Sequence, residues 1–312
     1  TELQKGKIST ITSQNKKAKN QEKGDSQKKI EELQQKLQQA VSRIPAYLLI
    51  DYDKQINSCS DLVLTGDQKL FKSVTGYTLK NFEDALSVGC IRKDWIDSSI
   101  VDMNLRIDKL SLEDFLAGNN SIFNLLGAFE RDGKAETPGT PGWLAIEMLD
   151  QMSYGFCDPA KTIRTPACST GTFPLEAFRR LYIGLREAIA DPAERIRHIL
   201  TNQLWADEEN TVPYLMTRAA FSILLGSRFD IDEMNLSCYN ALEEESNMKH
   251  DVVIMNPPFQ APQQSSGKRG GGDGLWNKFV EKHENENYDV PFTPPAGASQ
   301  SLTDLNTKVF LS

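Results

Sequence analysis

Apolar residues spaced three and four positions apart predict helices in the first part of the chain. Between Gln27 and Pro45 they recur on one face, with glutamine, glutamate and lysine elsewhere. This pattern predicts an amphipathic helix that ends before Pro45, because proline disfavours helical geometry in the residue that precedes it. Short apolar runs predict further helices at 61–64, 70–74, 79–86 and 112–116. The run Tyr47–Ile50 is predicted to be a short strand.

From about residue 133 the pattern changes to short apolar runs that alternate with helical segments. Strands are expected near 162–165, before Asp207, at 238–242 and at 251–255, and helices at 143–149, 175–181 and 211–225. Strands that alternate with helices predict an α/β domain with a parallel sheet. Residues 1–26 are polar and are expected to be disordered. The expected division is a basic tail at 1–26, an α-rich connector module at 27–130, an α/β domain at 133–283 and a polar tail at 284–312.

The charge of the chain is uneven. The net charge of −8 over 312 residues argues against a protein that binds nucleic acid through a simple excess of basic residues. Residues 1–43 nevertheless carry ten lysines and arginines against five acids, a local charge of +5. This basic run is either a solvated tail or an arm that contacts phosphates.

Other features of the composition limit the location and the chemistry of the protein. No apolar run approaches the roughly 18 residues that cross a bilayer, and no signal peptide opens the chain, so we expect a cytoplasmic protein without membrane contact. The five cysteines are scattered and odd in number, which indicates reduced thiols. The three histidines show no ligand-like spacing, so no metal site is expected.

The most informative stretch is 251–259, in which a short apolar run ends in Asn256, Pro257, Pro258 and Phe259. Proline cannot donate to a sheet ladder, so the strand must end at Asn256. An amide and an aromatic ring are thereby placed at the carboxyl edge of a parallel sheet, where open α/β folds bind ligands. The side-chain carbonyl of Asn256 and a backbone carbonyl beside the prolines suit both hydrogens of an exocyclic amine, and Phe259 suits stacking. A strand that ends in a proline-rich turn is the structural alternative.

Two further stretches have the pattern of a nucleotide-type site. Small residues between Thr165 and Phe173 join a predicted strand to a helix, and such a turn lets the backbone approach a ligand. Asp207 and Glu208 follow a second predicted strand, where an acid can accept the hydroxyls of a ribose. The interval from Gly171 to Glu208 exceeds the usual ~20 residues and requires a longer helical segment between them. A solvated acidic turn is the alternative.

Together these stretches resemble the motifs of S-adenosylmethionine-dependent amino-methyltransferases, best known in those that methylate N6 of adenine in DNA. Residues 256–259 are similar to the catalytic motif Asn-Pro-Pro-Phe/Tyr. The resemblance implies catalytic roles for Asn256, Pro257, Pro258 and Phe259. It implies cofactor contacts from Thr137, Pro138, Thr165, Pro166, Ala167, Cys168, Gly171, Thr172, Phe173, Asp207, Glu208 and Asn240.

The cofactor stretch departs from the family pattern at two positions. The family motif is Asp-Pro-Ala-Cys-Gly-Thr-Gly-Thr-Phe, whereas this chain has Thr165 in place of the Asp and Ser169 in place of the first Gly. The family's acidic group contacts the methionyl end of the cofactor, so its replacement bears on affinity. A positive φ at Ser169 would add strain. A third family strand usually ends in Asp, where this chain has Asn240.

The resemblance implies a fold and a function. The fold class is α/β, with a Rossmann-like methyltransferase sheet that is expected to be incomplete at its carboxyl end, preceded by a small α-rich module. The expected function is transfer of a methyl group from S-adenosylmethionine to N6 of adenine in DNA, with base flipping. DNA and further domains or subunits of a restriction-modification system are the expected partners. Residues 43–86 are weakly similar to the tail of restriction-type helicase polypeptides that continue into a methyltransferase, which would make the chain a piece of a larger protein.

Three alternatives to this function stay open. The first is methylation of guanine N2 in RNA or of glutamine in proteins, because Asn-Pro-Pro-Phe also occurs in those enzymes. The second is a non-catalytic interaction module of a restriction-modification or phage assembly, which the replacements at Thr165, Ser169 and Asn240 favour. The third is an unrelated nucleotide-binding α/β protein.

Overall fold

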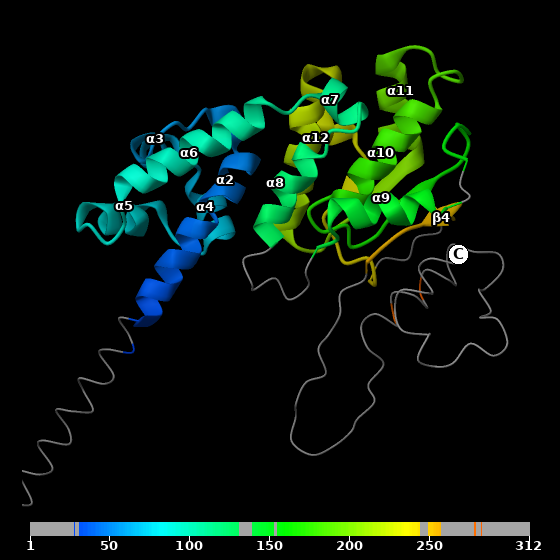
Figure 1. Cartoon of the computed structure of the whole chain (residues 1–312). Helices are drawn as coiled ribbons and strands as arrows, with labels where there is room; N and C mark the ends of the chain where they lie inside the picture. Colours follow the sequence, from blue (N-terminus) through cyan, green and yellow to red (C-terminus); the bar gives the residue numbers. More distant parts are fainter. Residues whose placement is uncertain are drawn as a thin grey trace, which may run out of the picture. The chain divides into compact units, whose positions relative to one another are not determined.

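The computed structural model describes residues 28, 31–130, 139–152, 155–243, 249–256, 278 and 282, without the side chains of 128–130 (Figure 1). The candidate residues Thr137, Pro138, Pro257, Pro258 and Phe259 lie outside the described residues. The chain divides into two compact units. The described residues up to Tyr47, together with Ile56–Ile100, belong to the first unit, and Leu48–Gln55 and the described residues from Val101 onward belong to the second.

The first unit is built from short capped helices. It contains a helical segment at 31–42, α3 (Cys59–Thr65), α4 (Gln68–Thr75), α5 (Leu79–Ser87) and the first half of α6 (Lys93–Asp108). The side chains of Ser58, Asp67 and Thr78 each accept a hydrogen bond from the backbone N–H three residues later, which satisfies a helix end that would otherwise lack a partner. The short helices predicted in this region are therefore confirmed.

The predicted strand at Tyr47–Ile50 is wrong, because these residues belong to α2 (Ile44–Ile50). A short apolar run fits a helix that is buried on several sides as well as a strand, and Tyr47 and Leu49 are fully buried. The Tyr47 ring packs on Phe71 with centroids 5.3 Å apart, and its hydroxyl accepts a 2.7 Å hydrogen bond from the Asp67 N–H. The preceding helical segment does end before Pro45, and proline is tolerated in the first turn of the new helix.

The second unit contains a parallel sheet. Its strands are β1 (Ile163–Thr165), β2 (Leu204–Asp207), β3 (Leu236–Ser237) and β4 (Val252–Val253), in the order β3-β2-β1-β4. The order matches the first four strands, 3-2-1-4, of a Rossmann-type sheet. The predicted α/β fold class is therefore confirmed.

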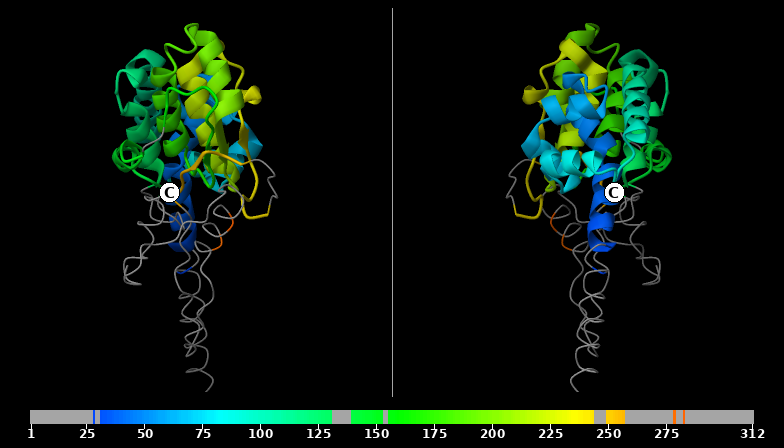
Figure 2. Two further views of the ribbon diagram at one scale, coloured as in Figure 1. Left: turned by 90° about the vertical axis from the view of Figure 1, so that its right-hand side faces the viewer. Right: turned by 90° about the vertical axis from the view of Figure 1, so that its left-hand side faces the viewer.

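Helices pack on this sheet and on one another (Figures 1 and 2). They are the second half of α6, α7 (Leu112–Leu116), α8 (Ser121–Glu130), α9 (Gly142–Asp150), α10 (Thr172–Gly184), α11 (Pro192–His198) and α12 (Thr211–Leu225). Helix α10 contacts β1, β2 and α9, and its Phe178 meets Phe221 of α12 edge to face at 5.7 Å. Short 3₁₀ turns lie at Tyr52–Lys54, Gly226–Arg228 and Ile231–Glu233.

Helices α7 and α8 lie in the second unit, although the division was expected near residue 130. The physical reason is that α7 packs on α10 and α12, and α8 packs on α9. The boundary between the units falls within α6 instead.

Two strands, β3 and β4, differ in their bounds from expectation. β4 is limited to Val252–Val253 of the expected 251–255. β2, expected before Asp207, begins at Leu204 after a π-helical turn at 199–203. The strand expected at 238–242 is displaced to β3 at Leu236–Ser237. The Asn240 side-chain carbonyl accepts a 2.9 Å hydrogen bond from the Leu242 N–H, and such an asparagine turn takes the chain out of the sheet.

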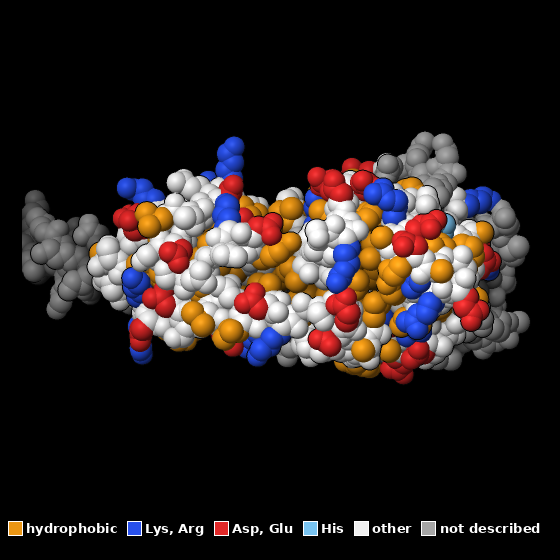
Figure 3. Space-filling view, turned by 90° about the horizontal axis from the view of Figure 1, so that it is seen from above, with side chains coloured by type: hydrophobic (Ala, Val, Ile, Leu, Met, Phe, Trp, Pro, Cys, Tyr) orange, Lys and Arg blue, Asp and Glu red, His pale blue; other side chains and the backbone are white. Residues whose placement is uncertain are grey.

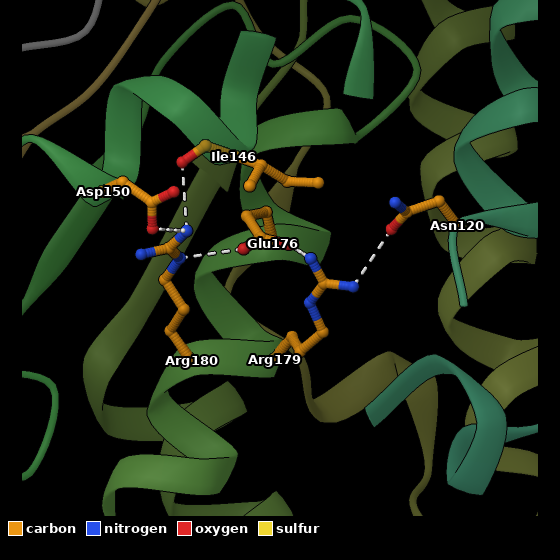
Figure 4. Close-up of polar contacts among 6 residues, drawn as sticks. All are labelled: Asn120, Ile146, Asp150, Glu176, Arg179 and Arg180. Atoms are coloured by element: carbon orange, nitrogen blue, oxygen red, sulfur yellow. Dashed lines mark hydrogen bonds and ion pairs between the residues drawn. The ribbon is translucent and has the colours of Figure 1, made fainter. Parts of the chain in front are cut away.

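A network of charged side chains connects α10 to its neighbours (Figure 4). The Glu176 carboxylate is 2% exposed, accepts a 2.8 Å hydrogen bond from Arg180 Nε and pairs with Arg179. Arg180 also donates to the Ile146 carbonyl and the Asp150 carboxylate of α9, at 3.0 and 2.7 Å. Arg179 donates to Asn120, just before α8, and lies over the rings of Phe115 and Phe123. These contacts fix α9 and the start of α8 relative to α10.

No helix within the described ranges is long and apolar enough to cross a membrane.

Candidate functional site

The loop between β1 and α10 has an unusual backbone. Ala167, Ser169 and Gly171 all have positive φ, at 50°, 53° and 95°. The positive φ suspected at Ser169 is therefore confirmed, and for a residue with a side chain it costs about 1 kcal/mol. At Gly171 a Cβ atom would lie 2.8 Å from the Thr217 side chain, so only glycine fits there.

The end of β2 and the middle of α12 hold this loop in place. The Cys168 N–H donates to the Asp207 carbonyl at 2.9 Å, and the Ser169 N–H donates to the Glu208 carboxylate at 2.8 Å. From α12, the Thr217 hydroxyl donates to the Ser169 carbonyl at 3.0 Å. The strained turn is thus stabilised by contacts with residues that lie about 40 positions further along the chain.

The other predicted residues of this loop are mostly packed into the fold. Thr165 is fully buried, and its hydroxyl donates to the Trp205 carbonyl at 3.3 Å. Buried positions are also found for Pro166, Cys168, Thr172 and Phe173. Ala167 and Ser169 are half-buried, and the N–H groups of Ala167, Cys168 and Ser169 are bonded to Asp207 and Glu208.

Glu208 and Asp207 have different surroundings, as expected for neighbours at the end of a strand. Glu208 is 5% exposed, and its carboxylate accepts hydrogen bonds from the Ser169 N–H and from the backbone and side chain of Asn210. Asp207 instead pairs with the buried Arg164 at 3.2 Å and accepts from the Ala167 N–H at 3.3 Å. Both carboxylates accept an N–H of the loop, and Asp207 is in addition neutralised by the buried Arg164. Both assignments as cofactor contacts stay predictions.

Asn256 lies at the same edge of the sheet as the loop. β4 is paired with β1, and the Ile254 N–H donates to the Arg164 carbonyl at 2.9 Å. Asn256 is half-buried two residues further on, at the carboxyl end of β4. Because neighbouring strands are about 4.8 Å apart, β4 and β2 are separated by about 10 Å across β1. The structure thus brings together the loop, Glu208 and Asn256.

Asn240 lies outside the sheet, in the turn that follows β3. Its side-chain carbonyl is engaged by the Leu242 N–H, and its amide donates to Glu243 at 3.3 Å. Its assignment as a cofactor contact stays a prediction.

Sequence reasoning missed three residues that shape this site: Arg164, Asn210 and Thr217. Arg164 could have been suspected, because a charged residue within a predicted strand of a sheet covered by helices requires a buried partner. Thr217 lies within the regular pattern of a helix, so nothing in the sequence indicates its contact with the loop. Asn210 is the helix N-cap, a position where asparagine is common for another reason.

Several polar side chains of the sheet and its connections lie around Arg164. Its guanidinium donates to the Tyr239 hydroxyl at 3.0 Å in addition to Asp207, and one of its nitrogens, Nη1, has no hydrogen-bond partner among the described residues. Burial raises the pKa of Asp207 from 3.8 to about 6, although the Arg164 charge opposes this effect. Burial, aided by the Arg164 charge, lowers the pKa of His250 from 6.5 to about 4. The His250 ring packs on Trp205, with centroids 5.7 Å apart.

We expect His250→Gln to change the pH dependence of stability. Asp207 contributes stability that is present below pH 3.8 and lost as the pH rises through 6, whereas His250 contributes stability that is present above pH 6.5 and lost as the pH falls through 4. Each contribution is about 3 kcal/mol, so they nearly cancel in the parent chain. As the pH falls from 6.5 to 4, the free energy of unfolding of the variant, measured in urea, should rise by up to about 3 kcal/mol relative to that of the parent chain. A difference that does not change with pH would contradict this.

Neither a group of metal ligands among the described residues nor a basic tract on the face drawn in Figure 3 is present. Among the described residues no group of three or more His, Cys, Asp and Glu side chains could hold a metal ion. On the face drawn in Figure 3, basic and acidic side chains of the described residues are interspersed. That face therefore offers no electrostatic indication of a nucleic-acid interface.

Several solved structures resemble this chain at low sequence identity, and no protein-family model matches it. A Listeria monocytogenes protein proposed to be a class I S-adenosylmethionine-dependent methyltransferase is 11% identical, with a TM-score of 0.42, over 79% of this chain and 70% of that one. The DrdV–DNA complex is 13% identical, with a TM-score of 0.48, over 78% and 29%. The methyltransferase subunit of a type I restriction-modification system from Streptococcus thermophilus is 15% identical, with a TM-score of 0.38, over 70% and 43%. At these values the function of this chain has to be inferred from its own residues.

Proposed function

We propose that the loop at 165–173 and Glu208 form a binding site for S-adenosylmethionine. The observation that carries this proposal is the arrangement at one sheet edge: a glycine-containing loop with positive φ angles, in which Ala167 and Ser169 are half-buried, next to a buried carboxylate at the end of the adjacent strand. The residues present fit such a group. Gly171 lets the loop pack against Thr217 of α12, which places Ser169 beside Glu208, and Glu208 offers an acceptor for a ribose hydroxyl.

The proposed reaction is methyl transfer to an exocyclic amine, with N6 of adenine in DNA as substrate. When bound, S-adenosylmethionine supplies an already activated methyl group, so the protein has to supply positioning and desolvation. Asn256 lies just beyond the carboxyl end of β4, the strand next to β1, from which the proposed cofactor loop continues, and Glu208 follows β2 on the other side of β1. Its side-chain carbonyl would accept a hydrogen bond from the amine and increase electron density on the attacking nitrogen. The amine of a paired adenine is inaccessible in the duplex, so the base would have to be flipped out.

Proposed partners are DNA and other parts of a restriction-modification assembly. The similarity of residues 256–259 to the catalytic motif of amino-methyltransferases supports this substrate. Methylation of guanine N2 in RNA or of glutamine in proteins uses the same kind of amine and the same Asn256 acceptor. Competition between adenine-containing DNA, RNA and peptide substrates in a methyl-transfer assay distinguishes these three.

A second candidate function is a non-catalytic interaction module of such an assembly. Thr165, which replaces the family's acidic residue, is fully buried and engaged by the Trp205 carbonyl. Ser169 adopts a strained φ, and the Asn240 carbonyl is used inside its own turn. All three observations favour weaker cofactor binding than in the enzymes that the chain resembles.

Calorimetric titration of the folded chain with S-adenosylmethionine and with S-adenosylhomocysteine tests the proposal. We expect micromolar binding of both compounds. Glu208→Ala should weaken it by at least about tenfold, because hydrogen bonds to a charged group contribute about 1.5–3 kcal/mol. Glu209→Ala is the matched control, since this neighbouring side chain is exposed.

The two candidate functions predict opposite results in this titration. Absence of binding to a chain whose thermal unfolding is cooperative would support the interaction module and contradict the methyltransferase. Equal losses in Glu208→Ala and Glu209→Ala would remove Glu208 from the site. Glu208→Gln keeps an acceptor for the Ser169 N–H and shows whether any loss comes from the ligand contact or from the loop.

A further inference from the structure

Glu208 is surrounded by hydrogen-bond donors of the chain itself. One carboxylate oxygen, Oε2, accepts from the Ser169 N–H at 2.8 Å. The other, Oε1, accepts from both the backbone N–H and the side-chain amide of Asn210, each at 2.9 Å. A carboxylate has about four acceptor positions, so three are already taken and one is left.

Asn210 bonds to Glu208 through its side chain but makes no cap bond to its own helix. It is the N-cap residue of α12, a helix of 15 residues, and an asparagine there usually accepts a hydrogen bond from the N–H two or three positions later. No such cap bond is present in α12. Residue 213 is proline, which has no N–H, so one of the two usual donors is missing. The Asn210 side-chain oxygen thus makes no cap bond, and its amide nitrogen donates to Glu208.

A ribose diol donates two hydrogen bonds, which is one more than the free capacity of Glu208. Two of the three internal donors are backbone N–H groups, fixed by the loop and by the start of α12. The Asn210 amide is the third, on an exposed residue whose side chain can rotate away. It is the internal donor that can leave most readily.

We propose that Asn210 is a positioning residue that competes with the ribose diol of an adenosine-type ligand for Glu208. In the ligand-free chain it orients the carboxylate, and it has to release Oε1 when both hydroxyls bind. This inference rests on the proposed cofactor site, and it adds a residue that sets affinity through the hydroxyl groups of the ligand. Removal of the amide is expected to tighten binding of ligands that carry the diol and to leave other ligands unaffected.

The test compares Asn210→Ala with the parent chain for three ligands: S-adenosylhomocysteine, adenosine and 2′,3′-dideoxyadenosine. Alanine keeps the backbone N–H to Glu208, and the helix loses no cap bond. We expect the variant to bind S-adenosylhomocysteine and adenosine about fivefold more tightly, the equivalent of one net hydrogen bond. Affinity for 2′,3′-dideoxyadenosine should stay within about twofold. Asn202→Ala, at another exposed asparagine, is the control and should change none of the three.

The outcomes separate this inference from the proposed function. If the parent chain binds S-adenosylhomocysteine and Asn210→Ala has unchanged affinity for both diol ligands, the competition is refuted while the cofactor site stands. Equal tightening for adenosine and 2′,3′-dideoxyadenosine also refutes it, because the effect would not depend on the hydroxyls. If neither the parent chain nor the variant binds any of the ligands, and both unfold cooperatively, the proposed function and this inference fail together.

Discussion

Replacement of Asn256 by alanine is expected to reduce methyl transfer to adenine-containing DNA by about 10²–10³-fold, the usual effect of removing one hydrogen-bonding group from the reacting centre. Asn256 is half-buried just beyond the carboxyl end of β4, and its side-chain carbonyl is the proposed acceptor for the amine. Glu208 lies at the end of β2, on the other side of β1, so its contacts are left intact. Affinity for S-adenosylhomocysteine should therefore stay within about twofold.

The experiment pairs initial rates of methyl transfer with calorimetric titration. Asn256→Asp keeps a carbonyl-type acceptor at the same position and should retain more activity than Asn256→Ala. Asn202→Ala serves as a remote asparagine control. Turnover by Asn256→Ala at the parent rate would refute the catalytic role of Asn256. A loss of S-adenosylhomocysteine affinity that parallels the loss of activity would indicate damage to the sheet edge instead.

Removal of the Glu176 carboxylate is expected to destabilise the second unit by about 3 kcal/mol, as is usual when one partner of a buried ion pair is deleted. Burial outweighs the two neighbouring arginines and raises the pKa of Glu176. The carboxylate is thus costly to bury. Its removal is nevertheless destabilising, because Arg179 and Arg180 are only 10% and 19% exposed and would each lose an ion-pair partner. Glu176→Ala should therefore lower the free energy of unfolding measured in urea.

Two comparisons make this prediction specific. Glu113→Ala removes the same side chain from an ion pair with Arg228 in which both partners are exposed, so its effect should be at most about 1 kcal/mol. Glu176→Gln keeps hydrogen-bond acceptors for the arginines and should cost less than Glu176→Ala. If Glu176→Ala and Glu113→Ala had equal effects, the network in Figure 4 would not stabilise the fold.

Helices with a clear period were predictable from the sequence, and short apolar runs were less so. Helix α12 was predicted at 211–225, as observed, because its apolar spacing is regular and Gly226 follows it. The run at 47–50 was misread as a strand, since burial on several sides removes the period that separates the two states. The 16-residue helix α6 was overlooked although its buried Ile96, Ile100, Met103 and Ile107 have helical spacing, so the signal was present.

The candidate site was predictable in its order along the chain but not in its contacts. The loop, the acidic turn and Asn256 could be aligned to three strand ends, because parallel strands place their carboxyl ends at one edge. The hydrogen bonds among Ser169, Glu208 and Asn210 depend on side-chain rotamers and on residues 39 positions apart. No spacing rule reports such contacts, and the division of roles between Asp207 and Glu208 likewise required the position of Arg164.

The strand order also determines when each part of the site can form during synthesis. β1 is central, and its two partners arrive at different times: β2 follows about 40 residues later, whereas the Thr162–Asp251 contact at the start of β4 spans 89 residues. Chains emerge from the ribosome amino end first, at about 5–20 residues per second. We therefore expect the loop and Glu208 to assemble on the nascent chain before Asn256 has been made. A ligand that binds the loop and Glu208 would therefore bind to a partly synthesised domain and would stabilise it before β4 and Asn256 are added.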